Sequence, residues 1–173
     1  MVEVTVARLG LDSASNTHVV ILQEKGGTRL LPIWIGKPEF DSIRMQINGI
    51  KLQRPLTHDL CRSLIQGLGG QLRRVQITKV QNSTYFAELH IQRGESVVQI
   101  DARPSDSIAI ALRLSAPIFA QESLLTAFAS DEEGAATLPE PEATTGEGDE
   151  LSAEKLKEHL EKLRPEDFGK FNL

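Results

Sequence analysis

The chain has 173 residues, of which 40% are hydrophobic and 25% charged, and its net charge is -5 at neutral pH. This composition supports a packed domain of ordinary size and excludes a wholly disordered protein. The single cysteine excludes an intrachain disulfide and a cysteine-based metal cluster, and without an export signal or a long apolar run we expect a cytoplasmic protein that does not enter a membrane.

The charge is distributed unevenly. Residues 131–150 carry eight acidic and no basic residues, whereas residues 1–130 carry fourteen Lys and Arg against eleven acidic residues. We therefore divide the chain into a mildly basic domain (1–130), an acidic flexible linker (131–150) and an amphipathic C-terminal helix with its tail (151–173).

The first half of the domain alternates between strand and helix patterns. Polar residues alternate with valines over 2–6, and apolar runs at 17–24 and 28–36 flank a glycine pair, which predicts three strands with a hairpin. Pro38 opens a predicted helix that ends at Asn48. Thr57 caps a second predicted helix, in which leucines repeat every four residues at 60, 64 and 68 before a glycine pair ends it.

The second half continues the mixed pattern. Strands are expected at 72–80, 84–92 and 96–101, then a helix that Ser105 caps, a strand at 116–121 and a short helix at 122–129. The predicted fold class is α+β, with a mixed, largely antiparallel sheet of about six strands and three or four helices.

The C-terminal helix is expected to need a partner. Ser152 can cap it, and leucines at 156, 160 and 163 share one face, but burying three leucines does not offset the entropy of ordering the segment. We expect this helix to dock on its own domain, on a second subunit or on another protein.

Polar residues gather where the strand at 96–101 passes into a helix. Asp101 and Asp106 could converge across this turn as metal ligands or as a base, while Arg103 holds a phosphate oxygen with help from Ser105. The structural alternative makes Ser105 the helix cap, Asp106 a first-turn acid and Asp101 an ion-pair partner of an arginine. The spacing leaves both interpretations open.

Two further predicted junctions also carry polar and charged residues where a helix begins. In "RPLTHDL" (54–60), His58 is a candidate acid or base, Asp59 could orient it or bind a metal, and capping is the alternative for this motif. In "LPIWIGKPEF" (31–40), Trp34 is expected to anchor the core, and Glu39 either joins the acids or favours its helix start. If the three junctions lie on one side of the sheet, they form a single mixed-charge site.

Four ordered motifs resemble the bifunctional nuclease family. They are "LPIWIG" (31–36), "RPLTHDL" (54–60), "YFAEL" (85–89) and "DARPSDSIAIALR" (101–113), and the resemblance covers roughly residues 1–130. It implies an α+β fold, homo-oligomers among bacterial members, and nuclease activity on RNA and DNA. The chain has Ser107 where the family usually has alanine.

The leading hypothesis is a nuclease for RNA and DNA, assisted by a divalent cation such as Mg²⁺ or Mn²⁺. The expected catalytic residues are Asp101, Asp106 and His58. The expected substrate-binding residues are Arg54, Arg103 and Ser105. The expected metal ligands are Asp101, Asp106, Asp59 and Glu39.

The alternative hypothesis is a non-enzymatic binding or regulatory module. In it the same polar motifs cap helices and form an interface between copies of the chain. Both hypotheses include a homo-oligomer, with a dimer as the expected form.

Overall fold

The computed structural model describes residues 1–12 and 15–127. The chain divides into Met1–Glu133 and Gly134–Leu173, and all described residues belong to the first unit. The predicted linker and C-terminal helix lie outside the described residues. No helix in the described ranges is long and apolar enough to cross a membrane.

Eight strands of the described chain form one sheet, in the order β6-β5-β4-β7-β1-β2-β3-β8. The strands are β1 (Val2–Asp12), β2 (Thr17–Glu24), β3 (Arg29–Ile35), β4 (Gln71–Gln81), β5 (Thr84–Arg93), β6 (Ser96–Ala102), β7 (Ile118–Ala120) and β8 (Thr126–Ala127). The helices are α1 (Lys37–Ile47), α2 (Thr57–Gly67), α3 (Pro104–Leu114) and the 3-10 turn η1 (Glu122–Leu124).

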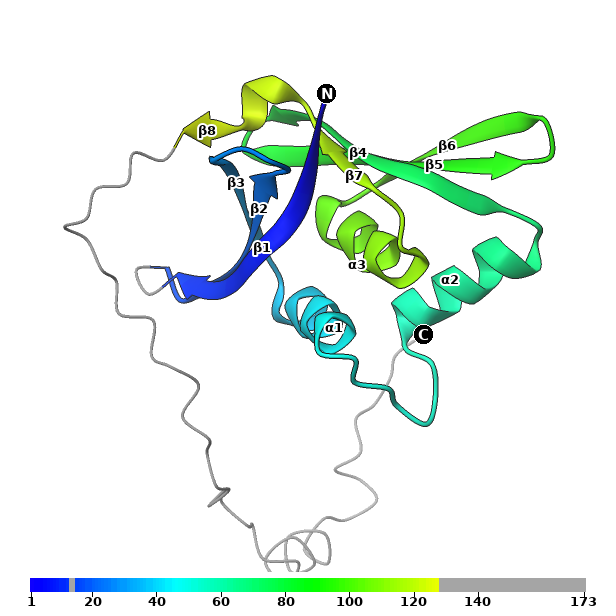
Figure 1. Cartoon of the computed structure of the whole chain (residues 1–173). Helices are drawn as coiled ribbons and strands as arrows, with labels where there is room; N and C mark the ends of the chain where they lie inside the picture. Colours follow the sequence, from blue (N-terminus) through cyan, green and yellow to red (C-terminus); the bar gives the residue numbers. More distant parts are fainter. Residues whose placement is uncertain (13–14, 128–173) are drawn as a thin grey trace, which may run out of the picture. The chain divides into compact units, whose positions relative to one another are not determined.

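The sheet joins two antiparallel units through one short strand (Figure 1). β1, β2 and β3 form one unit and β4, β5 and β6 the other, while β7 pairs antiparallel with β1 and parallel with β4. The predicted α+β class with a largely antiparallel sheet is confirmed, with eight strands in place of about six. The predicted helix at 122–129 is wrong in its described part, because η1 is a single turn and β8 follows it.

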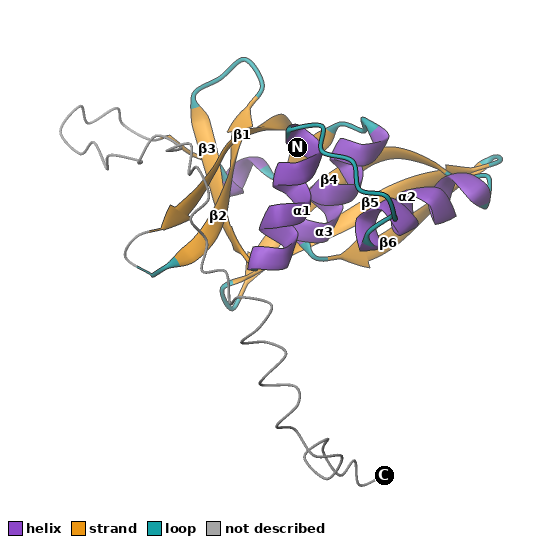
Figure 2. Ribbon diagram, turned by 90° about the horizontal axis from the view of Figure 1, so that it is seen from below, coloured by secondary structure: helices purple, strands orange, loops and turns teal. Residues whose placement is uncertain are grey.

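The three α-helices lie on one side of the sheet (Figure 2). α3 is central, since it packs against α1, α2, β4 and β5. Its Ile108, Ala109 and Ala111 are fully buried with Val20 and Val75 of the strands. This near-continuous apolar run in α3 explains why the helix after the 101–106 junction occupies the core of the domain.

The helix starts differ from the predicted ones by one or two residues. Arg103 is the N-cap of α3 and Pro104 its first residue, so Ser105 is the second helical residue and not the cap. Leu56 is the N-cap of α2 in place of Thr57. A first-position proline is favourable because its missing N–H would have no intrahelical partner there.

Two apolar features of the sequence lie at the surface, and the prediction that Trp34 anchors the core is wrong. Leu60, Leu64 and Leu68 of α2 are 51%, 52% and 67% exposed, because α2 turns Cys61 and Ile65 toward the core instead. An amphipathic pattern with two apolar stripes does not show which stripe is covered. Trp34 is 51% exposed, since alternation along β3 directs it away from the side that its buried neighbours face.

Candidate functional site

The N-terminal ends of α1, α2 and α3 meet at one cavity of about 350 Å³. Eight residues line it, and every helix contributes: Pro38, Glu39, Ser42, Leu56, Thr57, His58, Arg103 and Asp106. Because the first-turn N–H groups of a helix have no intrahelical acceptor and carry partial positive charge, three converging N-termini favour an anion.

Local chain geometry creates this convergence. α1 begins directly after β3, and α3 begins directly after β6, so both helices start at a strand end. Gly36 is the N-cap of α1, and the Glu39 carboxylate occupies the space that a side chain at Gly36 would need. α2 reaches the same place because it packs on α3.

A buried histidine links two of the helices. His58 Nδ1 lies 2.8 Å from Ser42 Oγ, and His58 Nε2 lies 3.0 Å from Asp106 Oδ1. An ionised carboxylate can only accept, so the Nε2 proton is directed to Asp106. In the neutral imidazole Nδ1 is then the acceptor, and the Ser42 hydroxyl donates to it. Both ring nitrogens are therefore engaged.

Arg103 forms the charged edge of the cavity. Its Nε donates to Asp106 Oδ2 at 2.7 Å, and its Nη2 donates to Glu39 Oε1 at 2.7 Å. These hydrogen bonds raise the pKa of Arg103. Burial alone would raise the pKa of Asp106, but hydrogen bonds from Arg103 and His58 outweigh it and hold the pKa below its usual value. Asp106 is thus ionised at neutral pH.

One nitrogen of Arg103 is available to a ligand. Its Nη1 makes no hydrogen bond to any residue in the described ranges, and two thirds of the side chain is exposed. Glu39 and Asp106 hold the planar guanidinium in place through its other nitrogens. A fixed guanidinium with free N–H donors suits a phosphate oxygen.

Asp59 belongs to a different interaction. Its Oδ1 accepts from Arg113 Nε at 2.7 Å, and its Oδ2 accepts from the Leu56 N–H at 2.9 Å. Arg113 is buried, and it also donates to the backbone oxygens of Ala109 and Ser42. This cluster ties the three helices together, so Asp59 has a structural role here.

Three more expected site residues lie outside the cavity, as Asp59 does. Asp101 is exposed on β6 opposite Glu88, while its neighbour Ala102 pairs with buried Ala87. Strand alternation therefore turns Asp101 to the face without helices, away from Asp106. Arg54 is exposed in the segment before α2. Ser105 is buried in α3 and lines a neighbouring pocket that also includes Arg103.

The expected metal ligands do not come together. Of the four, Glu39 and Asp106 reach the cavity, and both already bind Arg103. The described residues contain no group of three or more His, Cys, Asp or Glu side chains that could hold a metal ion. The donor set at the cavity thus does not fit a resident divalent cation.

Sequence reasoning did not single out Ser42. It lies on α1 with 5% of its surface exposed, at the third position after Glu39. The available signal was helical spacing, because residues three apart share a face and Glu39 was already a candidate. A lone serine inside a helix carries no distinctive motif, so its contact with His58 required the tertiary structure.

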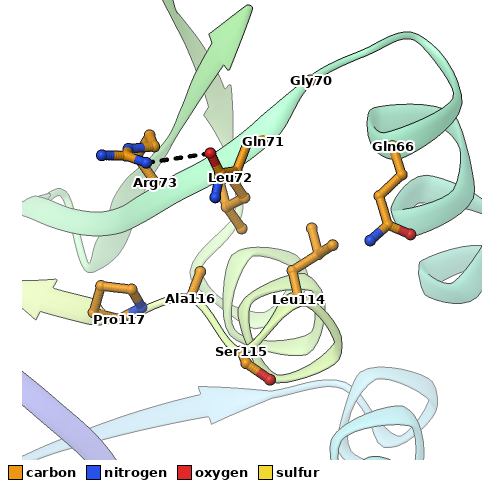
Figure 3. Close-up of a pocket in the computed structure, with 9 residues that line it drawn as sticks. All are labelled: Gln66, Gly70, Gln71, Leu72, Arg73, Leu114, Ser115, Ala116 and Pro117. Atoms are coloured by element: carbon orange, nitrogen blue, oxygen red, sulfur yellow. Dashed lines mark hydrogen bonds between the residues drawn. The ribbon is translucent and has the colours of Figure 1, made fainter.

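A second pocket provides a contrast (Figure 3). It has a volume of about 370 Å³ and lies at the C-terminal ends of α2 and α3, between Gln66, Leu72 and Leu114. Arg73 lines it, and its Nη1 donates to Gln71 at 3.2 Å. Helix C-termini expose carbonyl oxygens, which disfavour anions. The lining residues include no carboxylate and no histidine, so this pocket offers no acid–base chemistry.

In the comparison with known proteins, the domain match and the plant relatives indicate the same family. The bifunctional nuclease domain matches residues 20–133. An uncharacterized protein of Mycobacterium tuberculosis is 39% identical over 174 residues, covering 97% of this chain and 98% of that protein. Bifunctional nuclease 1 of Oryza sativa subsp. indica is 28% identical over 110 residues, covering 62% of this chain and 33% of that protein. Bifunctional nuclease 1 of Arabidopsis thaliana is 29% identical with 62% and 34% coverage.

Proposed function

Because this chain belongs to the bifunctional nuclease domain family, we propose that it cleaves phosphodiester bonds of RNA and DNA at the cavity between the three helix N-termini. The plant relatives named bifunctional nucleases share only about a third of their length with it, so their activity reaches this chain as a proposal. The observation that carries the proposal is the convergence of three positive helix ends around the free Nη1 of Arg103.

The phosphate would bind between Arg103 and the first turns of α1 and α2. Glu39 and Asp106 keep the Arg103 guanidinium oriented, so binding of the substrate does not have to restrict the conformations of this side chain. As negative charge develops on the phosphoryl oxygens, the guanidinium and the helix N–H groups stabilise it. Thr57 at the first position of α2 adds a hydroxyl to the cavity wall.

His58 would move the proton. Its Nε2–H is held by the Asp106 carboxylate, and its Nδ1 faces the Ser42 hydroxyl. A carboxylate on the far nitrogen favours the protonated ring that forms when Nδ1 accepts a proton. In this proposal His58 is the general acid–base and Asp106 orients it.

Assistance by Mg²⁺ or Mn²⁺ stays a prediction. The expected ligands Asp101 and Asp59 lie away from the cavity, and no step above passes through a metal. Cleavage assays with and without a chelator test the metal requirement directly.

The decisive experiment compares cleavage of single-stranded RNA and DNA by the purified full chain and by two arginine variants. Arg103→Ala removes the proposed phosphate ligand, and Arg73→Ala removes the same charge from the second pocket. We expect Arg103→Ala to lower the cleavage rate about 100-fold or more and Arg73→Ala to leave it within about 3-fold. Equal rates for wild type and Arg103→Ala would refute the proposed site.

One observation favours the second candidate function, an oligomeric binding module. Large apolar side chains are exposed in succession from the end of α1 through α2: Ile47, Ile50, Leu52, Leu56, Leu60, Leu64 and Leu68. A monomer rarely exposes so continuous an apolar surface. We propose that a second copy of the chain covers it, because a two-fold interface presents the same surface from both partners, so the exposed leucines of α2, which we call the leucine ridge, can pack against their own counterparts.

A further inference from the structure

We propose that Ser42 is the nucleophile of this site and forms a covalent nucleotidyl-serine intermediate, a phosphodiester between Ser42 Oγ and the retained nucleotide, with His58 as its base and Asp106 as the carboxylate that orients the base. This inference deepens the proposed function and rests on it for the substrate. Neither the motifs nor the family comparison assigns a role to Ser42. The geometry of three side chains from three helices carries the inference.

The three side chains form a continuous serine–histidine–aspartate relay. The distances are 2.8 Å from Ser42 Oγ to His58 Nδ1 and 3.0 Å from His58 Nε2 to Asp106 Oδ1. Both lie in the range that a nucleophile, its base and the orienting carboxylate require. Such relays are recognised by geometry and roles, and their order along the chain varies between folds.

Ser42 is buried in the fold but lines the cavity, together with His58 and Asp106. The other serines near the site lack this combination. Ser105 lies in the neighbouring pocket, and the Ser107 hydroxyl is buried with no hydrogen-bond partner in the described part of the chain. Ser63 is exposed on α2, where its hydroxyl donates to the Asp59 backbone oxygen. Of these serines, only Ser42 has both a base and access to the cavity.

The proposed step balances without a redox partner. Ser42 Oγ attacks phosphorus and its proton passes to His58 Nδ1, so an Oγ–P bond forms. The ester P–O bond to the leaving sugar breaks, and His58 returns the proton to the leaving oxygen. Water then attacks phosphorus, gives a proton through His58 back to Ser42, and releases a phosphate monoester.

Arg103 completes the arrangement. Its Nη1 can bind a non-bridging phosphoryl oxygen while Asp106 holds its Nε. Asp106 thus joins the charge-stabilising arginine to the base, and one carboxylate positions both. If water attacked the phosphorus directly, the Ser42 hydroxyl would not be required. Removing this hydroxyl therefore distinguishes direct attack by water from attack by Ser42.

The first test does not depend on nuclease activity. The full chain is treated with a fluorophosphonate ester, a reagent that phosphonylates activated serines, and the labelled position is found by peptide mass spectrometry. We expect labelling at Ser42 at least about 100-fold faster than at Ser63, because a hydrogen-bonded base contributes at least that factor. In the His58→Gln variant, the rate of labelling at Ser42 should fall to the rate measured at Ser63. Equal labelling of Ser42 and Ser63 in the wild type would overturn the proposal.

The second test uses cleavage itself. Ser42→Ala should lower RNA cleavage about 100-fold or more, and acid quenching of the wild-type reaction on phosphorus-labelled RNA should trap a labelled nucleotide bound to Ser42 through a phosphodiester. Thermal unfolding of each variant shows whether it is folded. Full cleavage by a folded Ser42→Ala variant would reject Ser42 as nucleophile while leaving the proposed function intact. Labelled Ser42 without any nucleic-acid cleavage would support the nucleophile and reject the nuclease assignment.

Discussion

His58 on α2 and Asp106 on α3 are joined by a 3.0 Å hydrogen bond between Nε2 and Oδ1, although 48 positions separate them in the chain. The same carboxylate binds Arg103 through its other oxygen. Asp106 therefore connects a buried histidine to an exposed arginine, so one carboxylate holds two of the candidate functional side chains.

The first prediction concerns Asp106→Asn. The amide is neutral, so it no longer balances Arg103 or favours a protonated His58, and we expect cleavage to fall about 100-fold or more. The change is measured as initial rates on single-stranded RNA. Asp101→Asn is the matched control, because Asp101 lies on the other face of the sheet. A larger loss in Asp101→Asn than in Asp106→Asn would contradict the site assignment.

A second prediction concerns acid stability. Burial alone raises the pKa of Asp59 and Asp106, but hydrogen bonds from Arg113 and Arg103 respectively outweigh it, so both pKa values are lowered. A lowered carboxyl pKa stabilises the fold fully above the unfolded pKa of about 3.9, and this contribution is lost as pH falls through the folded value.

This pH dependence is checked by thermal unfolding. The difference in melting temperature between wild type and Asp106→Asn should shrink as the pH falls below about 4, where the Asp106 carboxylate becomes protonated in the folded state. A difference that grows as the pH falls below about 4 would have the wrong sign and would contradict the ion pairs.

A third prediction concerns the buried arginine. Asp59→Ala leaves the Arg113 guanidinium buried without its carboxylate, so we expect a loss of about 1–3 kcal/mol in the free energy of unfolding. Denaturant titration measures it. The control is Asp41→Ala, which breaks the exposed pair with Arg44 and should cost less than about 0.5 kcal/mol. Equal losses in the two variants would show that the Asp59–Arg113 pair is not a structural element.

A fourth prediction concerns Ser107, whose hydroxyl is fully buried and has no hydrogen-bond partner among the residues that the structure describes. Ser107→Ala removes an unsatisfied polar group and improves helix propensity, so we expect a gain of about 1–2 kcal/mol in stability. Ser63→Ala, on the exposed side of α2, is the control, because it makes the same change in helix propensity without removing a buried hydroxyl. If Ser107→Ala stabilises no more than Ser63→Ala does, the hydroxyl has a partner within the fold.

A fifth prediction concerns the leucine ridge of α2. Leu64→Lys places a charge in the middle of the proposed contact between two copies, and we expect the full chain to shift from dimer to monomer in light scattering after size exclusion. Lysine at an exposed helical position is compatible with the fold. Val97→Lys, at a similarly exposed valine on β6, is the control and should leave the mass unchanged. A monomeric wild-type chain would refute the interface.

The sequence by itself determined the elements and the family. Alternation with polar residues marked the strands, and the boundaries of the helices were marked to within a few residues by Pro38, Pro104 and the glycines after α1 and α2, because backbone preferences are local. The four motifs indicated the bifunctional nuclease family, which the domain match confirms. The three polar strand-to-helix and loop-to-helix junctions were also visible, together with His58, Arg103, Asp106 and Glu39 as candidates.

The tertiary structure decided which candidates meet. Asp101 and Asp106 are five positions apart, yet strand alternation turns Asp101 to the open face while the first turn of α3 directs Asp106 into the cavity. Ser42 and His58 meet only because α1 and α2 both pack beside α3. The covered stripe of α2 was likewise chosen by that packing and not by its leucine spacing. Local preferences are encoded within a few residues, whereas these contacts depend on how distant elements bury their surfaces together, and no short stretch of sequence contains that information.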